Sequence, residues 1–328
     1  MRINIYDKDL NRVDIIESRF VSCLWAEGYN TTEALSLELQ ESESHKRNVL
    51  PGYFVGRTDR KALMVITTVE AKDGKIVATG KTADRLLQDV SFIGKIEAGA
   101  NIDTAVINAY NNSSKCVDLD FEETSLGVAY DETIENMSIL EMAQTMAQSK
   151  DVGFRVTKNG NRPLAAFYQP KSDNPYRLAK GFGNVDVQSI VLSIENLKNY
   201  AIVLGRDAND KTVRVDVDES NGMDRKEIIV DSGETPKDGE STNQFKERLK
   251  SIGHETLNEH RKTWSANFSP IETEFGKKYD LGDFVILTLP DYDLRFMARV
   301  TRFQEIEQNN SSKVTISVGE ITIVRSKK

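Results

Sequence analysis

Residues 281–303 read LGDFVILTLPDYDLRFMARVTRF. FVILTL is a short, almost wholly apolar run, and RFMARVTRF mixes apolar with polar residues, with Pro290 and Asp291 between the two. Short segments rich in apolar and β-branched residues predict two strands, and a Pro-Asp pair favours the tight turn of a β-hairpin. A single hairpin is ordinary scaffold, so its meaning depends on whether the pattern recurs.

The pattern recurs near the other end of the chain. Residues 51–80 read PGYFVGRTDRKALMVITTVEAKDGKIVATG, and residues 281–320 continue the first stretch to KVTISVGE. Both have the order strand, hairpin, strand, hairpin, strand, glycine, with Gly52 and Gly282 before the first strand. Two unrelated β-meanders align in much the same way, so the pattern leaves coincidence and duplication both open. Duplication predicts two similar barrels, one near each end, with equivalent strands.

Size and charge set limits on the class of protein. The chain has 328 residues, which predicts two to four domains. The net charge of -8 and the lack of a long Lys/Arg block argue against tight binding to DNA phosphates. The N-terminus alternates and has no signal-peptide core, and no apolar run is long enough to span a bilayer. Cys23 and Cys116 are no disulfide framework, and Cys23 is expected to be a small buried residue.

The pattern of elements predicts a mainly β fold with α+β insertions. We expect two similar small β-barrels that flank a central α+β domain and a helix-containing linker. The predicted domains are a first barrel at 1–95, an α+β domain at 96–185, a second barrel formed by 186–230 and 264–328, and an inserted loop and helix at 231–263.

Helical spacing appears in the central region and in the insertion. Apolar stripes predict helices over NIDTAVINAYNN at 101–112, SILEMAQTMAQSKD at 138–151 and about 243–262. Ser138 with Glu141 predicts a capping box, and Thr82 is expected to cap a short helix in TADRLLQDV. Asn159-Gly160 predicts the turn of a hairpin.

Two stretches resemble metal sites. HETLNEH places His254 and His260 six residues apart, whereas a zinc-protease helix needs a spacing of four, so a solvated helix face is the simpler interpretation. Asp216, Asp218, Ser220 and Glu227 match positions 1, 3, 5 and 12 of a calcium loop. Position 6 is Asn221 instead of Gly and the flanks are strand-like, which favours a charged loop between strands. Whether the loop binds a cation is left open.

No catalytic motif is visible. Gly181 and Gly183 lack the spacing of a dinucleotide loop and are interpreted as a linker. With 51 Asp and Glu residues, some pair of carboxylates always occurs, and none is singled out. The sequence therefore predicts no catalytic residue, no cofactor-binding residue, no metal ligand and no cofactor.

Several passages in collinear order resemble the baseplate hub or tail-tip hub proteins of long-tailed phages, in particular siphophages. They are GKTADRLLQDVSFI at 80–93, ENMSILEMAQTMAQSKDVGFRV at 135–156, and NGMDRKEIIVDSGE at 221–234. The last is similar to a Gly-hydrophobic-Asp-Arg-Arg-Glu signature, filled here by Met223, Asp224, Arg225, Lys226 and Glu227. Lys226 replaces the second Arg of the signature, and the loop at 231–244 is unusually polar.

The resemblance implies a structural protein of the virion tail, assembled in the host cytoplasm, and not an enzyme. It implies a homotrimer in which two barrels per chain form a pseudo-sixfold ring between the tail tube or distal tail protein above and a tip or fibre protein below. Such a ring leaves a channel for DNA, without sequence-specific binding and without a membrane span. The host, the neighbouring tail proteins, the trimer interface and the charge of the channel wall are not fixed by the sequence.

Two rival functions are weighed against this one. A tail-associated cell-wall hydrolase or peptidase is the first, but the histidines form no constellation and the chain ends at Lys328, soon after the second predicted barrel. The second is a carbohydrate-binding β-module, which needs exposed aromatic clusters on loops. The loops are instead rich in Asp, Asn, Lys and Ser.

Overall fold

The computed structural model describes residues 1–17, 20–113, 118–122, 126–179, 182–261, 263–270, 274–289, 294–308 and 311–323. The fold is mainly β, with 50% strand and 19% helix, as the alternating sequence predicts. The chain forms two compact units. Unit 1 comprises Met1–Ser189 and Ala266–Lys328, and unit 2 comprises Ile190–Ser265.

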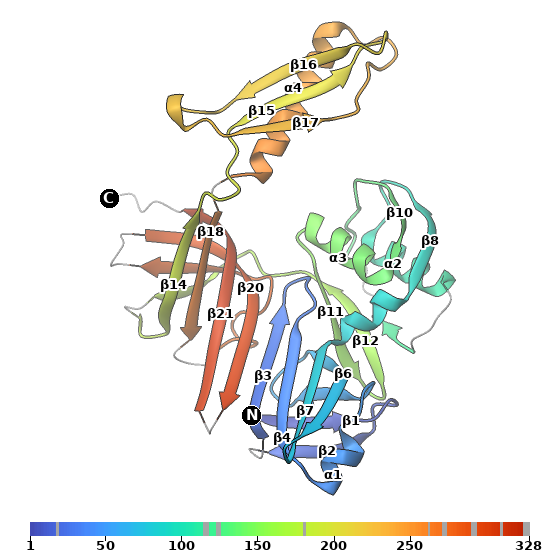
Figure 1. Ribbon diagram of the computed structural model, residues 1–328, viewed down its shortest axis with the longest axis vertical. Helices are drawn as coiled ribbons and strands as arrows, with labels where there is room; N and C mark the ends of the chain where they lie inside the picture. Colours follow the sequence, from blue (N-terminus) through green and yellow to red (C-terminus); the bar gives the residue numbers. More distant parts are fainter. Residues whose placement is uncertain are drawn as a thin grey trace. The chain divides into compact units, whose positions relative to one another are not determined.

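A 13-stranded sheet dominates unit 1 (Figure 1). Its strands are β1 (Arg2–Tyr6), β2 (Arg12–Glu17), β3 (Phe20–Gly28), β4 (Ala34–Gln40), β5 (Phe54–Arg57), β6 (Leu63–Lys72), β7 (Lys75–Thr82), β13 (Tyr176–Ala179), β14 (Val185–Ser193), β18 (Thr263–Pro270), β19 (Phe284–Leu289), β20 (Leu294–Gln308) and β21 (Ser311–Ile323). A short helix, α1 (Glu43–Asn48), follows β4. Seven of the strands, β1 to β7, lie between Arg2 and Thr82, in the region predicted as the first barrel.

The large sheet consists of two halves with the same strand order. The N-terminal half runs β3-β4-β7-β6-β5-β1, and the C-terminal half runs β14-β18-β21-β20-β19-β13. The halves differ at one end, because β1 pairs with β5 antiparallel whereas β13 pairs with β19 in parallel. Among the described residues, the pairing of neither half closes on itself, so the pairing shows two similar half-sheets and no closed barrel.

The two meanders agree in register as well as in order. The equivalent pairs are Phe54↔Val65 and Phe284↔Arg299, Val55↔Met64 and Val285↔Ala298, and Gly56↔Leu63 and Ile286↔Met297. A bulge follows Ile66 in β6, and another follows Val300 in β20. The two meanders thus match in strand order, register and bulge position, as duplication predicts.

The glycine before each meander has the same conformation and the same bonds. Gly52 has φ +83° and Gly282 has φ +84°, a region that side chains with a Cβ rarely adopt. The Gly52 N–H donates to the Ile66 carbonyl at 2.8 Å, and the Gly282 N–H donates to the Val300 carbonyl at 2.8 Å. The predicted turn at Pro290 and Asp291 lies outside the described residues.

The α+β part of unit 1 shares a hydrophobic core with the first half of the large sheet, which contributes Phe54, Leu63 and Val65. Its elements are η1 (Ala83–Asp89), β8 (Ser91–Ile96), α2 (Ile102–Asn112), β9 (Asp120–Phe121), β10 (Ile134–Ser138), α3 (Ile139–Ser149), β11 (Gly153–Asn159) and β12 (Arg162–Tyr168). The predicted stripe of α3 is buried, and Ser138 accepts a hydrogen bond from the Glu141 N–H at 3.2 Å. Asn30 connects this part to the large sheet, because its side chain bonds both the Val152 carbonyl and the Phe154 N–H.

Thr82 takes the predicted N-cap position, but its side chain does not cap the helix. The segment after Thr82 is a 3-10 helix, and Thr82 makes no side-chain cap bond there. Its hydroxyl instead accepts the Glu33 N–H at 3.0 Å, a partner 49 residues away that no local pattern reveals.

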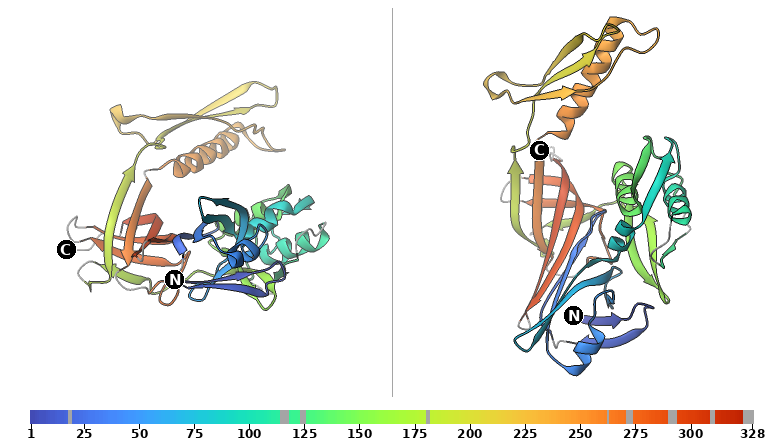
Figure 2. Two further views of the ribbon diagram at one scale, coloured as in Figure 1. Left: turned by 60° about the horizontal axis from the view of Figure 1, so that its bottom comes forward. Right: turned by 45° about the vertical axis from the view of Figure 1, so that its right-hand side comes forward.

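Unit 2 is a three-stranded sheet covered by a helix. Its elements are β15 (Tyr200–Arg206), β16 (Thr212–Asp218), η3 (Gly222–Asp224), β17 (Glu227–Asp231) and α4 (Thr242–Glu259). The sheet order is β16-β15-β17, and α4 lies along one face of it (Figure 2). The sequence assigns residues 186–230 to the second barrel. Of the strands in this range, only β14 joins the large sheet, whereas β15 pairs with β16 and β17 in a separate sheet.

The apolar stripe of α4 explains this separate sheet. Phe245, Leu249 and Leu257 are buried and form a core with the inward valines of β15 and β16. At Gly253 a Cβ would lie 2.6 Å from Val217, so glycine allows the helix to approach the sheet closely. An alternating strand pattern predicts the strand but not the sheet it joins.

Candidate functional site

The two histidines of HETLNEH have separate partners. His254 Nδ1 lies 2.9 Å from the Glu219 carboxylate, and His260 Nδ1 lies 2.9 Å from the Thr256 carbonyl. They do not converge on a common point. Within the described ranges, no group of three or more His, Cys, Asp or Glu side chains is arranged to hold a metal ion.

The carboxylates of the loop at 216–227 are likewise directed to different neighbours. Asp216 pairs with Arg214 at 2.7 Å, and that bond holds the pKa of Asp216 below its usual value. Glu227 pairs with Arg225 at 2.7 Å. Asp218 accepts the Ser220 N–H at 2.9 Å and the Ser220 hydroxyl at 2.5 Å. The structure therefore shows a charged connection between β16 and β17.

The other described positions singled out in the sequence, Cys23 and Gly183, form no candidate site. Cys23 is buried, and burial raises the pKa of its thiol to about 12, so it is an inert core residue as expected. Gly183 has φ +66°, which suits a turn, while Gly181 and Cys116 lie outside the described residues.

The strongest concentration of buried charge is where the two halves of the large sheet meet, which we call the joint. There β20 of the C-terminal half pairs antiparallel with β3 of the N-terminal half, from Arg302↔Gly28 to Gln308↔Ser22. Figures 1 and 2 show the red strand β20 beside the blue strand β3. The joint thus connects the two halves of one chain into a single continuous sheet.

A buried ion pair of the N-terminal half lies at the joint and contacts the other half. The Arg60 guanidinium donates to both oxygens of Glu27, at 2.6 and 2.9 Å, and both side chains are 6% exposed. Trp25 donates its indole N–H to the same carboxylate at 2.7 Å. The guanidinium lies 4.3 Å from the ring centre of Phe275 and 4.2 Å from that of Phe303. Arg60 therefore holds a carboxylate of its own half and two rings of the other.

A second arginine also bridges the joint. Arg57 of β5 pairs with Glu305 of β20 at 2.7 Å and with Asp59 at 2.6 Å. Burial lowers the pKa of Arg57, but the bonds to Asp59 and Glu305 outweigh it and the net shift is upward. Because a buried charge without its partner is costly, these pairs fix which strands meet.

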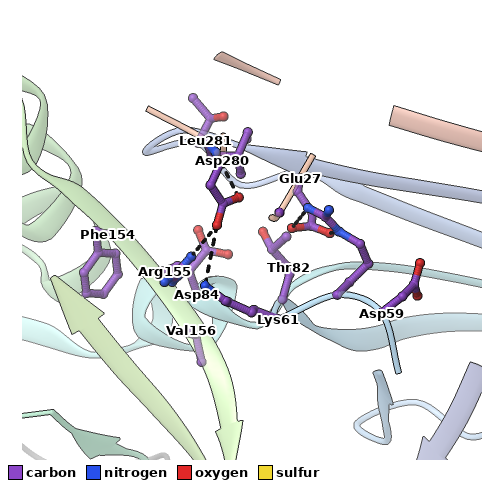
Figure 3. A pocket seen from close by; sticks show the side chains of 15 residues that line it. Glu27, Asp59, Lys61, Thr82, Asp84, Phe154, Arg155, Val156, Asp280 and Leu281 are labelled. Carbon is purple, nitrogen blue, oxygen red and sulfur yellow. Dashed lines mark hydrogen bonds and ion pairs between the residues drawn. The ribbon is translucent and has the colours of Figure 1, made fainter. Parts of the chain in front are cut away.

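A small cavity lies beside the joint, lined by side chains from β3, β11 and the segment before β19 (Figure 3). Figure 3 shows Arg155 and Lys61 directed at Asp280, at 3.3 and 3.7 Å. Its volume is about 90 Å³, well below the about 300–1,000 Å³ of ordinary small-molecule sites. Glu27, Asp59 and Asp280 around it each pair with an arginine or lysine, so we treat the cavity as part of the joint.

The joint residues were not found from the sequence. One signal was available, because the alternation that places Cys23 and Trp25 on one face of β3 also places Glu27 on that apolar face. A carboxylate on an inward face needs a cationic partner. That the partner is Arg60, 33 residues away, follows only from the fold.

Several solved structures share the fold of this chain. A tail protein from Neisseria meningitidis MC58 matches with a TM-score of 0.63 and 10% identity, over 97% of this chain and 96% of that one. The 43 kDa tail protein of prophage MuSo2 from Shewanella oneidensis matches with 0.59 and 13%, over 97% and 98%. Prophage tail protein gp18 from Listeria monocytogenes EGD-e matches with 0.56 and 12%, over 98% and 94%. The fold is that of phage and prophage tail proteins, as the collinear passages predict.

The family follows from the sequence itself. Residues 121–320 match the family described as Siphovirus ReqiPepy6 Gp37-like protein, which is more than half of the chain, and the chain belongs to that family. No curated protein matches it. No described helix has the length and apolar character to cross a membrane.

Proposed function

We propose that this chain is a structural hub protein of a phage or prophage tail tip or baseplate. Three copies form a ring that joins the tail tube, or a distal tail protein, to the tip or fibre protein, with a central channel for DNA. The chain acts in the virion tail and is assembled in the cytoplasm of the bacterial host.

The duplicated half-sheet carries this proposal. Each chain holds two halves of equal strand order and register, set side by side by the pairing of β20 with β3. Three such chains present six similar modules. A barrel-like module repeated in this way gives a ring with threefold symmetry and a pseudo-sixfold outline. Such a ring suits a junction between a sixfold tube and a threefold tip.

The acidic composition supports a passage for DNA. With a net charge of -8, the chain repels a polyanion more than it attracts one. We propose that the channel wall is acidic, so that DNA passes without binding. An image of the ring with a neutral or basic channel wall contradicts this part of the proposal.

The native mass and shape of the particle test the proposal. Light scattering after size-exclusion chromatography is expected to give the mass of three chains, and negative-stain images are expected to show a ring with a central hole. If isolated chains are monomers, the measurement is repeated on tails purified from a producing host, where the hub is assembled. A particle with any other stoichiometry in both samples overturns the ring.

The proposed role is not enzymatic. The rival hydrolase is tested by release of soluble fragments from peptidoglycan, with His254→Ala as the matched variant because His254 pairs with Glu219 on the surface. No release above buffer is expected from either protein. Release that is lost in the variant favours the hydrolase.

A further inference from the structure

The joint inside one chain is a template for the contact between two chains. It pairs β20, from the C-terminal half, with β3, from the N-terminal half. The strand equivalent to β20 in the N-terminal half is β6, and the strand equivalent to β3 in the C-terminal half is β14. A ring built from alternating halves needs the same contact once more between neighbouring chains, now with β6 of one chain and β14 of the next.

The edge of β6 that this contact needs is free in the described part of the chain. Two strands pair with successive parts of the same edge of β20. Strand β19 pairs with Leu294–Arg299, and β3 pairs with Arg302–Gln308, beyond the bulge. In β6, the same edge pairs with β5 only over Leu63–Val65. Beyond its bulge, Thr68–Lys72 pairs with β7 alone among the described residues. Four of these five residues are exposed, and Val69 is half-buried.

The matching edge of β14 is free as well. Within the described strands, β14 pairs only with β18, whereas its equivalent β3 pairs with both β4 and β20. The part of β14 that belongs to unit 1 is Val185–Ser189. In Figure 1, β14 and β6 lie on opposite sides of the joint. Each chain therefore offers one free edge of each kind, as a head-to-tail ring requires.

We propose that Thr68–Lys72 of β6 pairs antiparallel with Val185–Ser189 of β14 in a second copy of this chain. This proposal rests on the homotrimeric ring put forward above and names its interface. An unpaired strand edge is a template for another strand, and here the duplicated fold supplies the partner.

The contact between chains differs from the joint in its charges. Arg57 and Glu305 clamp the joint, but the equivalent positions in the second contact are Leu287 and Ala71, if the meanders are aligned by their register. That contact therefore depends on backbone hydrogen bonds and side-chain packing and lacks this ion pair. The joint forms as the chain folds, and the weaker contact forms when chains meet.

Disulfide trapping tests the pairing. Thr68, Glu70 and Lys72 are each changed to Cys, one at a time, in combination with Asp186→Cys or Val187→Cys, in a Cys116→Ser background. The two β14 positions cover both faces of that strand. Facing residues on adjacent antiparallel strands have Cβ atoms about 4.5–5.5 Å apart, close to what a disulfide needs. At least one pair is expected to give disulfide-linked dimers and trimers, but no larger species, on gels without reductant, and these bands are expected to disappear with reductant.

In the control, Glu97→Cys replaces the β6 cysteine. Glu97 is exposed and lies outside both strands, so no cross-linked bands are expected.

The outcomes separate the interface from the ring. A particle with the mass of three chains and no cross-link from any pair overturns the β6–β14 interface and leaves the ring intact. A ladder that extends past three chains supports the interface and overturns the closed trimer. Monomers that give no cross-link, in isolation and in tails, overturn both.

Discussion

Gly52 and Gly282 have the same backbone conformation in different surroundings, which makes them a matched pair. At Gly52, an added Cβ would meet only Lys8, at 3.4 Å. At Gly282, it would lie 2.4 Å from the Tyr29 ring and 2.8 Å from Pro170. Backbone strain alone costs on the order of 1–3 kcal/mol. We expect Gly52→Ala to lower the free energy of unfolding by that amount and Gly282→Ala to lower it further, as measured by urea titration. Equal losses would show that the crowding at Gly282 relaxes at no cost.

Asp84 makes the stability of unit 1 depend on pH. It is buried, with its carboxylate accepting the Thr32 hydroxyl at 2.8 Å, and burial raises its pKa above the usual 3.8. A carboxyl whose folded pKa is raised contributes stability that is present below the unfolded pKa and lost as pH rises through the folded pKa. Asp84→Asn removes this loss. We expect the free energy of unfolding of the variant, relative to the natural protein, to increase as pH rises from about 4 toward neutrality. A difference that is constant across this range contradicts the shift.

At the scale of elements, the N-terminus of α4 is held by a reciprocal cap. The Ser241 hydroxyl accepts the Gln244 N–H, and the Gln244 side chain accepts the Ser241 N–H at 2.9 Å. Ser241→Ala is expected to cost about 1 kcal/mol, while Ser241→Asn retains an acceptor and costs little. The measurement is urea unfolding followed by far-UV circular dichroism. Thr242→Ala, next in the chain and exposed, is the control and is expected to stay within ~0.5 kcal/mol of the natural protein.

The elements themselves were largely predictable because their signals are local. The strands of the first 80 residues, the hairpin at Asn159-Gly160, and helices α2, α3 and α4 follow from periodicity and turn chemistry. The repeat was visible in the sequence because Gly52 and Gly282 each precede a series of three strand patterns in the same order. The side chain of Thr82 does not cap the helix because its hydroxyl bonds to Glu33, and a distant partner overrides a local preference.

The assignment of strands to sheets was less predictable. Residues 186–230 contain several similar strand patterns, yet β14 pairs in the large sheet and β15 and β16 pair in unit 2. Alternation records that one face is buried, not which neighbour buries it. The same limit hid the joint, since Arg57 meets Glu305 only because β5 and β20 are brought together by long-range pairing.

At the scale of the whole molecule, the joint decides whether the two halves behave as one body. We expect Arg60→Met to be strongly destabilising, by about 3–5 kcal/mol, because it leaves the buried Glu27 carboxylate without its counter-charge. Glu27→Gln in the same chain removes that charge and keeps an acceptor for the Trp25 indole N–H. The double variant is therefore expected to be more stable than Arg60→Met alone. If the effects of two destabilising changes simply added, the double variant would instead be less stable.

The surface pair of Arg206 with Asp210 provides the matched control for this cycle, because both side chains are more than half exposed. Arg206→Met is expected to change the free energy of unfolding by less than ~1 kcal/mol. If Arg60→Met is as mild as that control, the Arg60–Glu27 pair contributes little to the joint. The Arg57–Glu305 pair and the backbone pairing of β20 with β3 would then be the main connections between the halves. The contact between chains lacks the equivalents of Arg57 and Glu305, and association of separate chains also costs translational and rotational entropy. We therefore expect the trimer to dissociate on dilution under conditions in which the joint stays folded, as measured by light scattering and circular dichroism on the same samples.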